Sequence, residues 1–371
     1  MVRMLFTALL IVHGLIHLIG FSKEWKIGPS TLLSGKTLFP FTAAAAKFAG
    51  IGWLITFLMW MITLACFILK KDSFWIAALI AAVLSQLLIV IYWYDAKYGT
   101  IANVIVLVGV IINIARVSFD NQVGKELASL LAARTTSSKE LRNDSITSLP
   151  PVVEKWLKAT RSTSVMPSQV KLAQQGAMRS KPGASWMSFD AIQNFTTDPP
   201  GFIWNARINA PGSIIIAGRD KFENGKGNML IKPLYIYTLA NSSGKEVDQG
   251  TMLRYMGELI WFPEAARKEY FEWEEIDSQT ATLRMSYKGV TAEGTFVFDE
   301  KGFVKRFSAQ RFGDFDGELR METWEVQVIE YKEMNEHITA SKCEVTWKLK
   351  DGDFTWLRLE LKDIAYDANI K

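Results

Sequence analysis

The sequence predicts a membrane bundle of α-helices followed by a soluble α+β domain, in which a curved, half-barrel-like antiparallel sheet wraps around a helix. Three observations lead to this fold class. Four apolar runs fill the first third of the chain, apolar and polar residues alternate after residue 168, and one strongly apolar helical stretch interrupts the alternation. Charge divides at the same place: residues 1–117 hold nine Lys or Arg against three acids, whereas the remainder is slightly acidic.

The apolar runs predict four membrane spans, so we expect a multi-pass protein of the cell membrane. Each run is close to the ~20 residues that cross a hydrocarbon core. Aromatic residues such as Trp25, Trp75 and Trp93 gather near their ends, as in an interfacial belt. No small-residue cleavage site follows the first run, so we interpret it as an uncleaved helix. The runs cover residues 4–21, 48–69, 74–94 and 100–117.

Basic residues do not fix the orientation of these spans. With the N-terminus inside, five Lys or Arg fall on each side of the membrane. The basic start at Arg3 and the turn "KKD" at 70–72 favour a cytoplasmic N-terminus. An even number of spans would then place the soluble domain in the cytoplasm as well.

Two of the three histidines, His13 and His17, lie in the first span. Residues four apart share a helix face, so both imidazoles point the same way and could bind a metal or haem. The alternative is that they hydrogen bond to Gln86 or Asn103 and fix the helix bundle. We favour the second interpretation, with no metal and no cofactor, because no Cys, second His pair or inward carboxylate completes a ligand shell here. An intramembrane polar residue is nevertheless a functional candidate.

A juxtamembrane helix and linker, 118–148, connects the two parts. "VGKELASLLAA" (123–133) has helical spacing and either continues the fourth span or lies on the membrane surface. The stretch 133–148 is polar, rich in Ser and Thr, and reads as a linker. We therefore take 1–117 as the transmembrane domain and 149–371 as a β-rich soluble domain.

The soluble domain opens with a short helix and continues with strands. Residues 149–161 carry Pro at the first turn and an apolar face of Val153, Trp156 and Leu157. Eight alternating stretches follow, from which we expect roughly ten short antiparallel strands in one large curved sheet or an open barrel. They are 185–195, 201–210, 212–222, 280–289, 294–312, 321–331, 340–352 and 354–364, with hairpin signals at 223–228, 299–302 and 350–353.

The stretch 250–270 predicts one strong helix. It is apolar nearly all round from Met252 to Phe262, with Arg254 and Glu258 as polar exceptions on one face. A helix this apolar needs more than one flat surface to cover it, so we expect the sheet to wrap it.

Familiar catalytic motifs are missing from the sequence. It has no nucleophile elbow, phosphate-binding loop, dinucleotide fingerprint or zinc-protease motif. The soluble part has one histidine, His337, which makes a nucleophile–histidine system a poor expectation. Two cysteines, Cys66 and Cys343, exclude a disulfide framework. The near-neutral charge argues against nucleic acid as a partner.

Several motifs together resemble a known family. "HGLIHLIGF" and "YWYDAKYGTIANV" are similar to a family of uncharacterised bacterial membrane proteins. "LPPVVEKWL", "PPGFIWNARI", "GTMLRYMGELIWFPEA" and "EGTFVFDEKG" resemble the β-rich domain of unknown function that accompanies it. After the "WL" helix, where that pattern often has Gly, this chain has "KATRS". The resemblance implies no activity. The expected sheet also resembles the half-barrels of bacterial lipoprotein carriers, which is an analogy of fold alone.

Three functions remain open. The first is a membrane-anchored protein whose β domain binds a lipid or other apolar ligand, for which we select Arg254, Tyr255, Glu258, Trp261 and Trp204 as candidate ligand-binding residues. The second is an enzyme at the membrane surface with an acid such as Glu258 as its base. The third is an envelope structural or sensor protein that packs with a membrane partner or a second copy. For any one aromatic residue, filling the core is the commoner use.

Overall fold

The structure is a computed structural model that describes residues 2–27, 33–134, 149–162 and 165–367. The chain forms two compact units, Met1–Asp120 and Asn121–Lys371. Each is described by itself.

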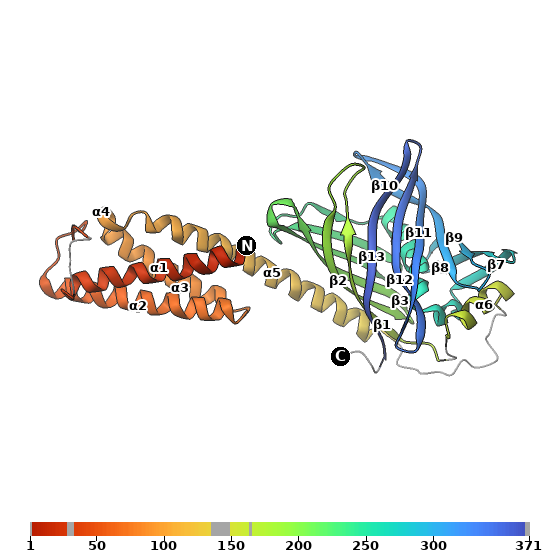
Figure 1. The fold of residues 1–371 in the computed structure, drawn as a ribbon, viewed down its shortest axis with the longest axis horizontal. Helices are drawn as coiled ribbons and strands as arrows, with labels where there is room; N and C mark the ends of the chain where they lie inside the picture. The colour runs from red at the N-terminus through yellow and green to blue at the C-terminus, as the bar shows by residue number, and fades with distance from the viewer. Residues whose placement is uncertain (1, 28–32, 135–148, 163–164, 368–371) are drawn as a thin grey trace. The chain divides into compact units, whose positions relative to one another are not determined.

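The first unit is helical (Figure 1). Its helices are α1 (Val2–Glu24), α2 (Ala43–Ile68), α3 (Phe74–Ile91), the short α4 (Trp93–Ala96) and the first part of α5 (Gly99–Ala132). Helices α1, α2, α3 and α5 are long and apolar enough to cross a membrane. The four apolar runs of the sequence lie in these four helices, which supports membrane association.

Small side chains let the helices of this unit approach one another. Ala78, Ala81 and Ala82 of α3 are buried with Trp60 of α2 and Val106 of α5. Close packing through small residues is the usual way in which helices associate in lipid, where the hydrophobic effect between helices is absent.

The second unit begins with the end of α5, which continues the fourth apolar run without a break to Ala132. Most of the expected linker, 135–148, lies outside the described residues. Helix α6 (Pro151–Ala159) follows, with Pro at its first position and Val153, Trp156 and Leu157 buried as its spacing predicts.

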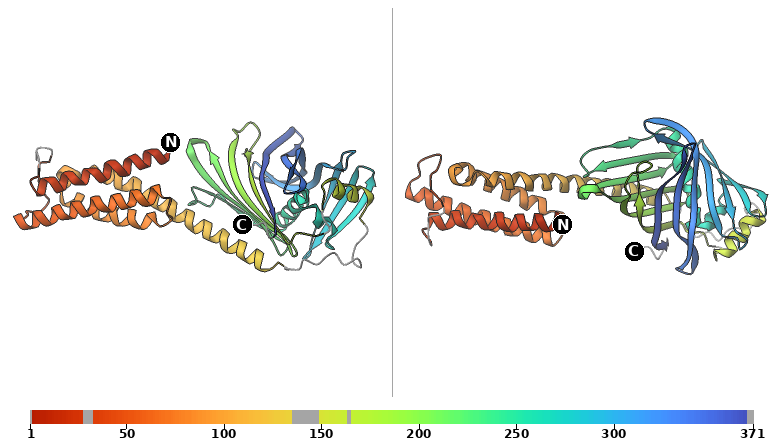
Figure 2. Two further views of the ribbon diagram at one scale, coloured as in Figure 1. Left: turned by 60° about the horizontal axis from the view of Figure 1, so that its bottom comes forward. Right: turned by 45° about the horizontal axis from the view of Figure 1, so that its top comes forward.

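One antiparallel sheet of 13 strands makes up most of this unit, in the order β6-β5-β4-β3-β2-β1-β13-β12-β11-β10-β9-β8-β7. The open, curved sheet is seen from two further sides in Figure 2. The strands are β1 (Gln169–Met178), β2 (Met187–Thr197), β3 (Pro200–Ala210), β4 (Ile214–Glu223), β5 (Lys226–Pro233), β6 (Ala240–Ser242), β7 (Phe271–Asp277), β8 (Thr280–Tyr287), β9 (Val290–Phe298), β10 (Val304–Phe315), β11 (Glu318–Met334), β12 (His337–Leu349) and β13 (Gly352–Tyr366).

The connectivity explains why a helix lies inside the curve. Strands β1 to β6 run outward to one edge as successive hairpins, and β7 to β13 return from the other edge to pair with β1. The chain between the two edge strands must therefore cross the sheet. Helix α7 (Lys245–Gly257) makes this crossing on the concave side, where it packs against β4, β5, β8, β9 and β10.

Helix α7 differs from the expected helix at 250–270. It starts five residues earlier, after Gly244 at φ 121°, and it ends at Gly257. Two 3₁₀ turns, Glu258–Trp261 and Pro263–Arg267, replace the rest. The early start was missed because the first turn is polar, and Pro263 prevents an α-helix from running through to residue 270 because it has no backbone N–H.

The end of α5 covers part of the convex face of the sheet. Glu126 Oε2 lies 3.0 Å from Arg219 Nε on β4, and Arg219 is buried. Ser129 Oγ donates to Glu223 Oε1 over 3.1 Å. Leu130 packs where Gly201 of β3 has no side chain: a Cβ there would stand 2.7 Å from Leu130 Cδ1. Residues 121–132 therefore belong physically to the β unit.

Candidate functional site

Three polar or aromatic residues form a row across the concave face. Gln193 of β2 is opposite Trp204 of β3, which is opposite Asp220 of β4. Directly opposed residues of an antiparallel sheet point to the same side. These side chains therefore point toward α7, which brings Arg254 to them.

Arg254 is the centre of a buried network. Its Nε donates to Glu258 Oε1 over 2.9 Å and its Nη1 to Asp220 Oδ2 over 2.5 Å. Gln193 Nε2 donates to Glu258 Oε2 over 2.8 Å. The guanidinium carbon also lies 5.1 Å from the ring centre of Trp204, within the range of a cation–π contact.

Burial and pairing act against each other in this network. Burial alone would lower the pKa of Arg254, but the carboxylates of Glu258 and Asp220 outweigh it and raise that pKa. Burial raises the pKa of the Glu258 carboxyl above its usual value, although Arg254 opposes it. Both oxygens of Glu258 accept hydrogen bonds. A role as a general base would require one of these bonds to break.

The five ligand-binding residues expected from the sequence separate into two groups. Arg254, Glu258 and Trp204 lie together in the network. Tyr255 and Trp261 lie in the packed core, where the Tyr255 hydroxyl donates to Thr196 O over 3.0 Å and Trp261 Nε1 donates to Ala340 O over 3.0 Å. Direct contact of these two residues with a ligand stays a prediction.

Arg311 of β10 is a second inward cation, and sequence reasoning missed it. Its guanidinium carbon lies 4.7 Å from the ring centre of Trp324 and 5.9 Å from that of Trp347. Its Nε is buried without a hydrogen-bond acceptor. The acid opposite it across the strands, Glu322, pairs with Arg320 instead. Among the described residues, no ion pair involves Arg311.

The environment of Arg311 is unfavourable to its charge. Burial, and then the charge of Arg254, lower the pKa of Arg311 to about 10. The side chain still carries its proton at neutral pH. The residue as a whole is partly exposed to solvent, although its Nε is buried.

An apolar wall continues from Arg311 along the concave face. Trp347 is opposite Trp324, and Leu357 and Met187 both lie opposite Met178, which places these side chains on the inner side. Trp347, Leu357, Met178 and Met187 are only partly buried against the core. Inner-face apolar side chains that stay partly open to solvent are what an apolar ligand would cover.

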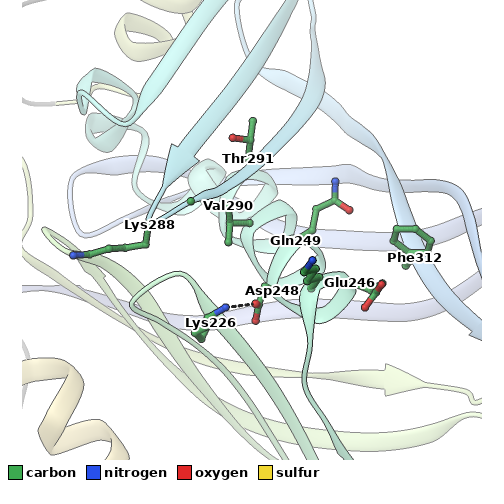
Figure 3. A pocket seen from close by; sticks show the side chains of 10 residues that line it. Lys226, Glu246, Asp248, Gln249, Lys288, Val290, Thr291 and Phe312 are labelled. Atoms are coloured by element: carbon green, nitrogen blue, oxygen red, sulfur yellow. Dashed lines mark hydrogen bonds and ion pairs between the residues drawn. The ribbon is translucent and has the colours of Figure 1, made fainter.

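A separate pocket of about 440 Å³ lies at the start of α7. Figure 3 shows the ion pair between Lys226 and Asp248 on its wall, which has a 2.9 Å separation. Lys245, Glu246 and Lys288 also line it. Its charged lining does not suit an apolar chain.

The polar residues expected inside the helical unit are connected. His13 Nε2 and Asn103 Oδ1 are 2.8 Å apart, and Asn103 Nδ2 donates to Gln86 Oε1 over 3.0 Å. His17 Nδ1 donates to His13 O over 2.7 Å, and His17 Nε2 is 3.0 Å from Ser85 Oγ. These contacts join α1 to α3 and α5, as the bundle-fixing interpretation requires. In the described ranges no cluster of three or more His, Cys, Asp or Glu could hold a metal ion.

Comparison with known proteins adds a family. A search of curated proteins finds no match. Two of the solved structures that match are a DUF1329 family protein from Desulfovibrio piger and a LolA superfamily protein from Nitrosomonas europaea. The first is 10% identical, with 59% of this chain and 93% of that chain covered and a TM-score of 0.36. The second is 12% identical, with 58% and 91% covered and a TM-score of 0.32. At these scores nothing about function follows. The model of a family of unknown function, DUF6544, matches residues 139–359, more than half of the sequence, and the chain belongs to this family.

Proposed function

We propose that the unit Asn121–Lys371 binds an amphiphilic ligand, with an acidic head group and an apolar chain, on the concave face of its sheet. The proposal rests mainly on Arg311, whose inward guanidinium has no ion-pair partner among the described residues and whose buried Nε has no acceptor. A buried donor without an acceptor is costly, and more so on a charged group. Asp220 and Glu258 hydrogen bond to Arg254 and not to Arg311, so an anion bound at the solvent side of the Arg311 guanidinium would supply its missing counter-charge.

A carboxylate or phosphate fits this position better than a neutral head group. Arginine presents its N–H groups in a planar fork that matches the oxygens of such anions. The guanidinium carbon lies 4.7 Å from the ring centre of Trp324 and 5.9 Å from that of Trp347. Such cation–π contacts use the face of the guanidinium and leave N–H groups at its edge for the ligand. The guanidinium therefore needs little reorganisation before binding.

The apolar chain would lie along Trp347, Leu357, Met178 and Met187. Covering these half-buried side chains removes apolar surface from water, which is favourable by roughly 25 cal/mol per Å². Four helices long and apolar enough to span a membrane support a lipid source for the ligand, since they would keep the unit beside a bilayer.

The test measures affinity for a matched pair of ligands. The full chain in phosphatidylcholine nanodiscs is titrated with a fluorescent long-chain fatty acid and then with the alcohol of the same chain. Arg311→Met should weaken binding of the acid about 10- to 100-fold, because a hydrogen bond to a charged group contributes roughly 1.5–3 kcal/mol. Binding of the alcohol should change little.

Arg306→Met is the control. Arg306 belongs to the same strand but points to the other face, beside Glu325 at 4.0 Å. Equal weakening by Arg306→Met and Arg311→Met, or no preference of the natural protein for the acid, would overturn the proposal.

A further inference from the structure

Four large apolar side chains are exposed where β3 turns into β4 and where β5 leads to β6. Ile214 is 43% exposed, Ile236 48%, Tyr237 65% and Leu239 59%. They come from two segments that lie side by side, because Leu234 N donates to Ile215 O over 2.7 Å. Exposed apolar side chains gathered in one place mark a surface for a partner.

The segment 234–239 is a fixed turn. Tyr237 N donates to Pro233 O over 3.4 Å, and Leu239 N donates to Ile231 O over 2.9 Å. Leu234 and Tyr235 both have positive φ, at 50° and 64°, a region that residues with a side chain rarely adopt. The turn therefore holds its apolar side chains outward in a set arrangement.

The two stretches of chain that carry these side chains hold basic residues and no acids of their own. No Asp or Glu occurs in 199–219 or in 224–245, the two stretches that carry the four residues. The exposed Arg207 and the half-buried Lys232 lie in them. Asp190 of β2 lies opposite Arg207, whereas Lys232 has Ala217 opposite it. Exposed apolar residues beside such a basic residue fit the surface of a bilayer that contains anionic lipids.

The path of the chain points to the same partner. The end of α5 enters the unit at Asn121 and runs beside β4 in the same direction, since Glu126 meets Arg219 and Ser129 meets Glu223. Of the two ends of β4, the one at Ile214 therefore lies nearer to Asn121, where the chain enters the unit. The preceding residues of α5 are the apolar stretch that is able to span a membrane.

We infer that an anionic lipid bilayer is the partner of a docking surface formed by Ile214, Ile236, Tyr237 and Leu239. These side chains insert into the head-group region of the leaflet that faces the domain. The occupant is the bilayer, and a second copy of the chain or another protein is the competing outcome. The docking is independent of any ligand on the concave face.

The experiment uses a fluorescent probe on the full chain. In a Cys66→Ser background, Leu239→Cys is labelled with an environment-sensitive dye and the protein is reconstituted in liposomes of phosphatidylcholine and phosphatidylglycerol. Cys343 is buried, and burial raises the pKa of its thiol to about 12, so it does not react. The matched control is Ile276→Cys on the edge strand β7, which is 58% exposed and stands beside Glu275 and Asp277.

Nitroxide groups on the lipid chains should quench the dye at position 239 and leave the dye at 276 unquenched. Removing phosphatidylglycerol should reduce the quenching at 239. Equal quenching at both positions, or none at 239, would overturn the inference. A dye at 239 that is shielded from aqueous iodide without lipid quenching would overturn it as well, because a protein surface would then cover the site.

Discussion

Arg311 Nε lies directly against the backbone of α7 at Gly250: a Cβ atom at position 250 would stand 3.1 Å from it. The missing side chain allows the helix to approach the strand while the guanidinium keeps its contact with the ring of Trp324. Gly250 thereby sets the position of the cation on which the proposed site depends.

Gly250→Ala should therefore weaken binding of the acidic ligand, because the added methyl group crowds the guanidinium. Gly124→Ala is the control, since Gly124 also lies in a helix but has nothing within 4 Å of an added Cβ. The control should leave binding unchanged and stabilise the helix by roughly 0.5–1 kcal/mol. Titration of both variants with the same fatty acid checks this. Unchanged affinity in Gly250→Ala would show that Arg311 does not need its present position.

Arg254→Met should make stability depend on pH in a defined direction. Burial already raises the pKa of Glu258, and loss of Arg254 removes the charge that opposes this rise. A carboxyl whose pKa is raised in the folded state stabilises the fold below its ordinary pKa of 4.5, and this stability is lost as pH rises through the folded-state value. Relative to the natural protein, the variant should be most destabilised at neutral pH, by about 3–5 kcal/mol.

Chemical denaturation at pH 5 and pH 8 measures this difference. Adding Glu258→Gln to Arg254→Met should abolish most of the pH dependence. A loss below about 1 kcal/mol at both pH values would instead indicate a solvated pair.

Two ion pairs of equal length should differ in strength. Arg219–Glu126 and Arg161–Glu333 both have 3.0 Å separations, but the side chain of Arg219 is only 3% exposed whereas that of Arg161 is 54% exposed. Glu126→Gln leaves a buried guanidinium without its carboxylate and should cost about 3–5 kcal/mol. Glu333→Gln should cost less than about 1 kcal/mol. Urea unfolding of the two variants compares them, and equal losses would contradict the buried role of α5.

The contact between the end of α5 and the sheet affects where a fragment that folds alone should begin. From the sequence we take residues 149–371 as the β-rich soluble domain, but Glu126, Ser129 and Leu130 cover part of the sheet. A fragment from Asn121 should thus unfold cooperatively and at higher urea than one from Leu149. Equal midpoints for the two fragments would mean that the end of α5 adds no stability.

The sequence predicted the elements whose pattern is local. Helix α6 was expected because Pro151 and its apolar spacing lie within nine residues, and β9, β10, β12 and β13 were expected from their alternation beside hairpin signals. Strands β5, β6 and β7 were not among the expected stretches. Strand β1 was not expected, because its inward position Gln174 is polar and interrupts the alternation; this buried side chain accepts from Trp204 Nε1 over 3.0 Å.

The candidate site could be predicted only in part, for a physical reason. Arg254 and Glu258 are four apart across the end of α7, so their contact is visible in the sequence. The surroundings of the Arg311 side chain depend on the strand register that places Trp324 opposite Trp347. They also depend on Gly250, which belongs to helix α7. Such long-range pairings leave no local signal.

The most direct test of the central claim maps where an acidic amphiphile binds. The full chain is irradiated with a fatty acid that carries a diazirine near the end of its chain, and labelled peptides are identified by mass spectrometry. The account predicts labels on inner-face residues of β1, β2, β12 and β13, such as Met178, Met187, Trp347 and Leu357, and their loss in Arg311→Met. Labels confined to α1, α2, α3 and α5, or inner-face labels that persist in Arg311→Met, would contradict it.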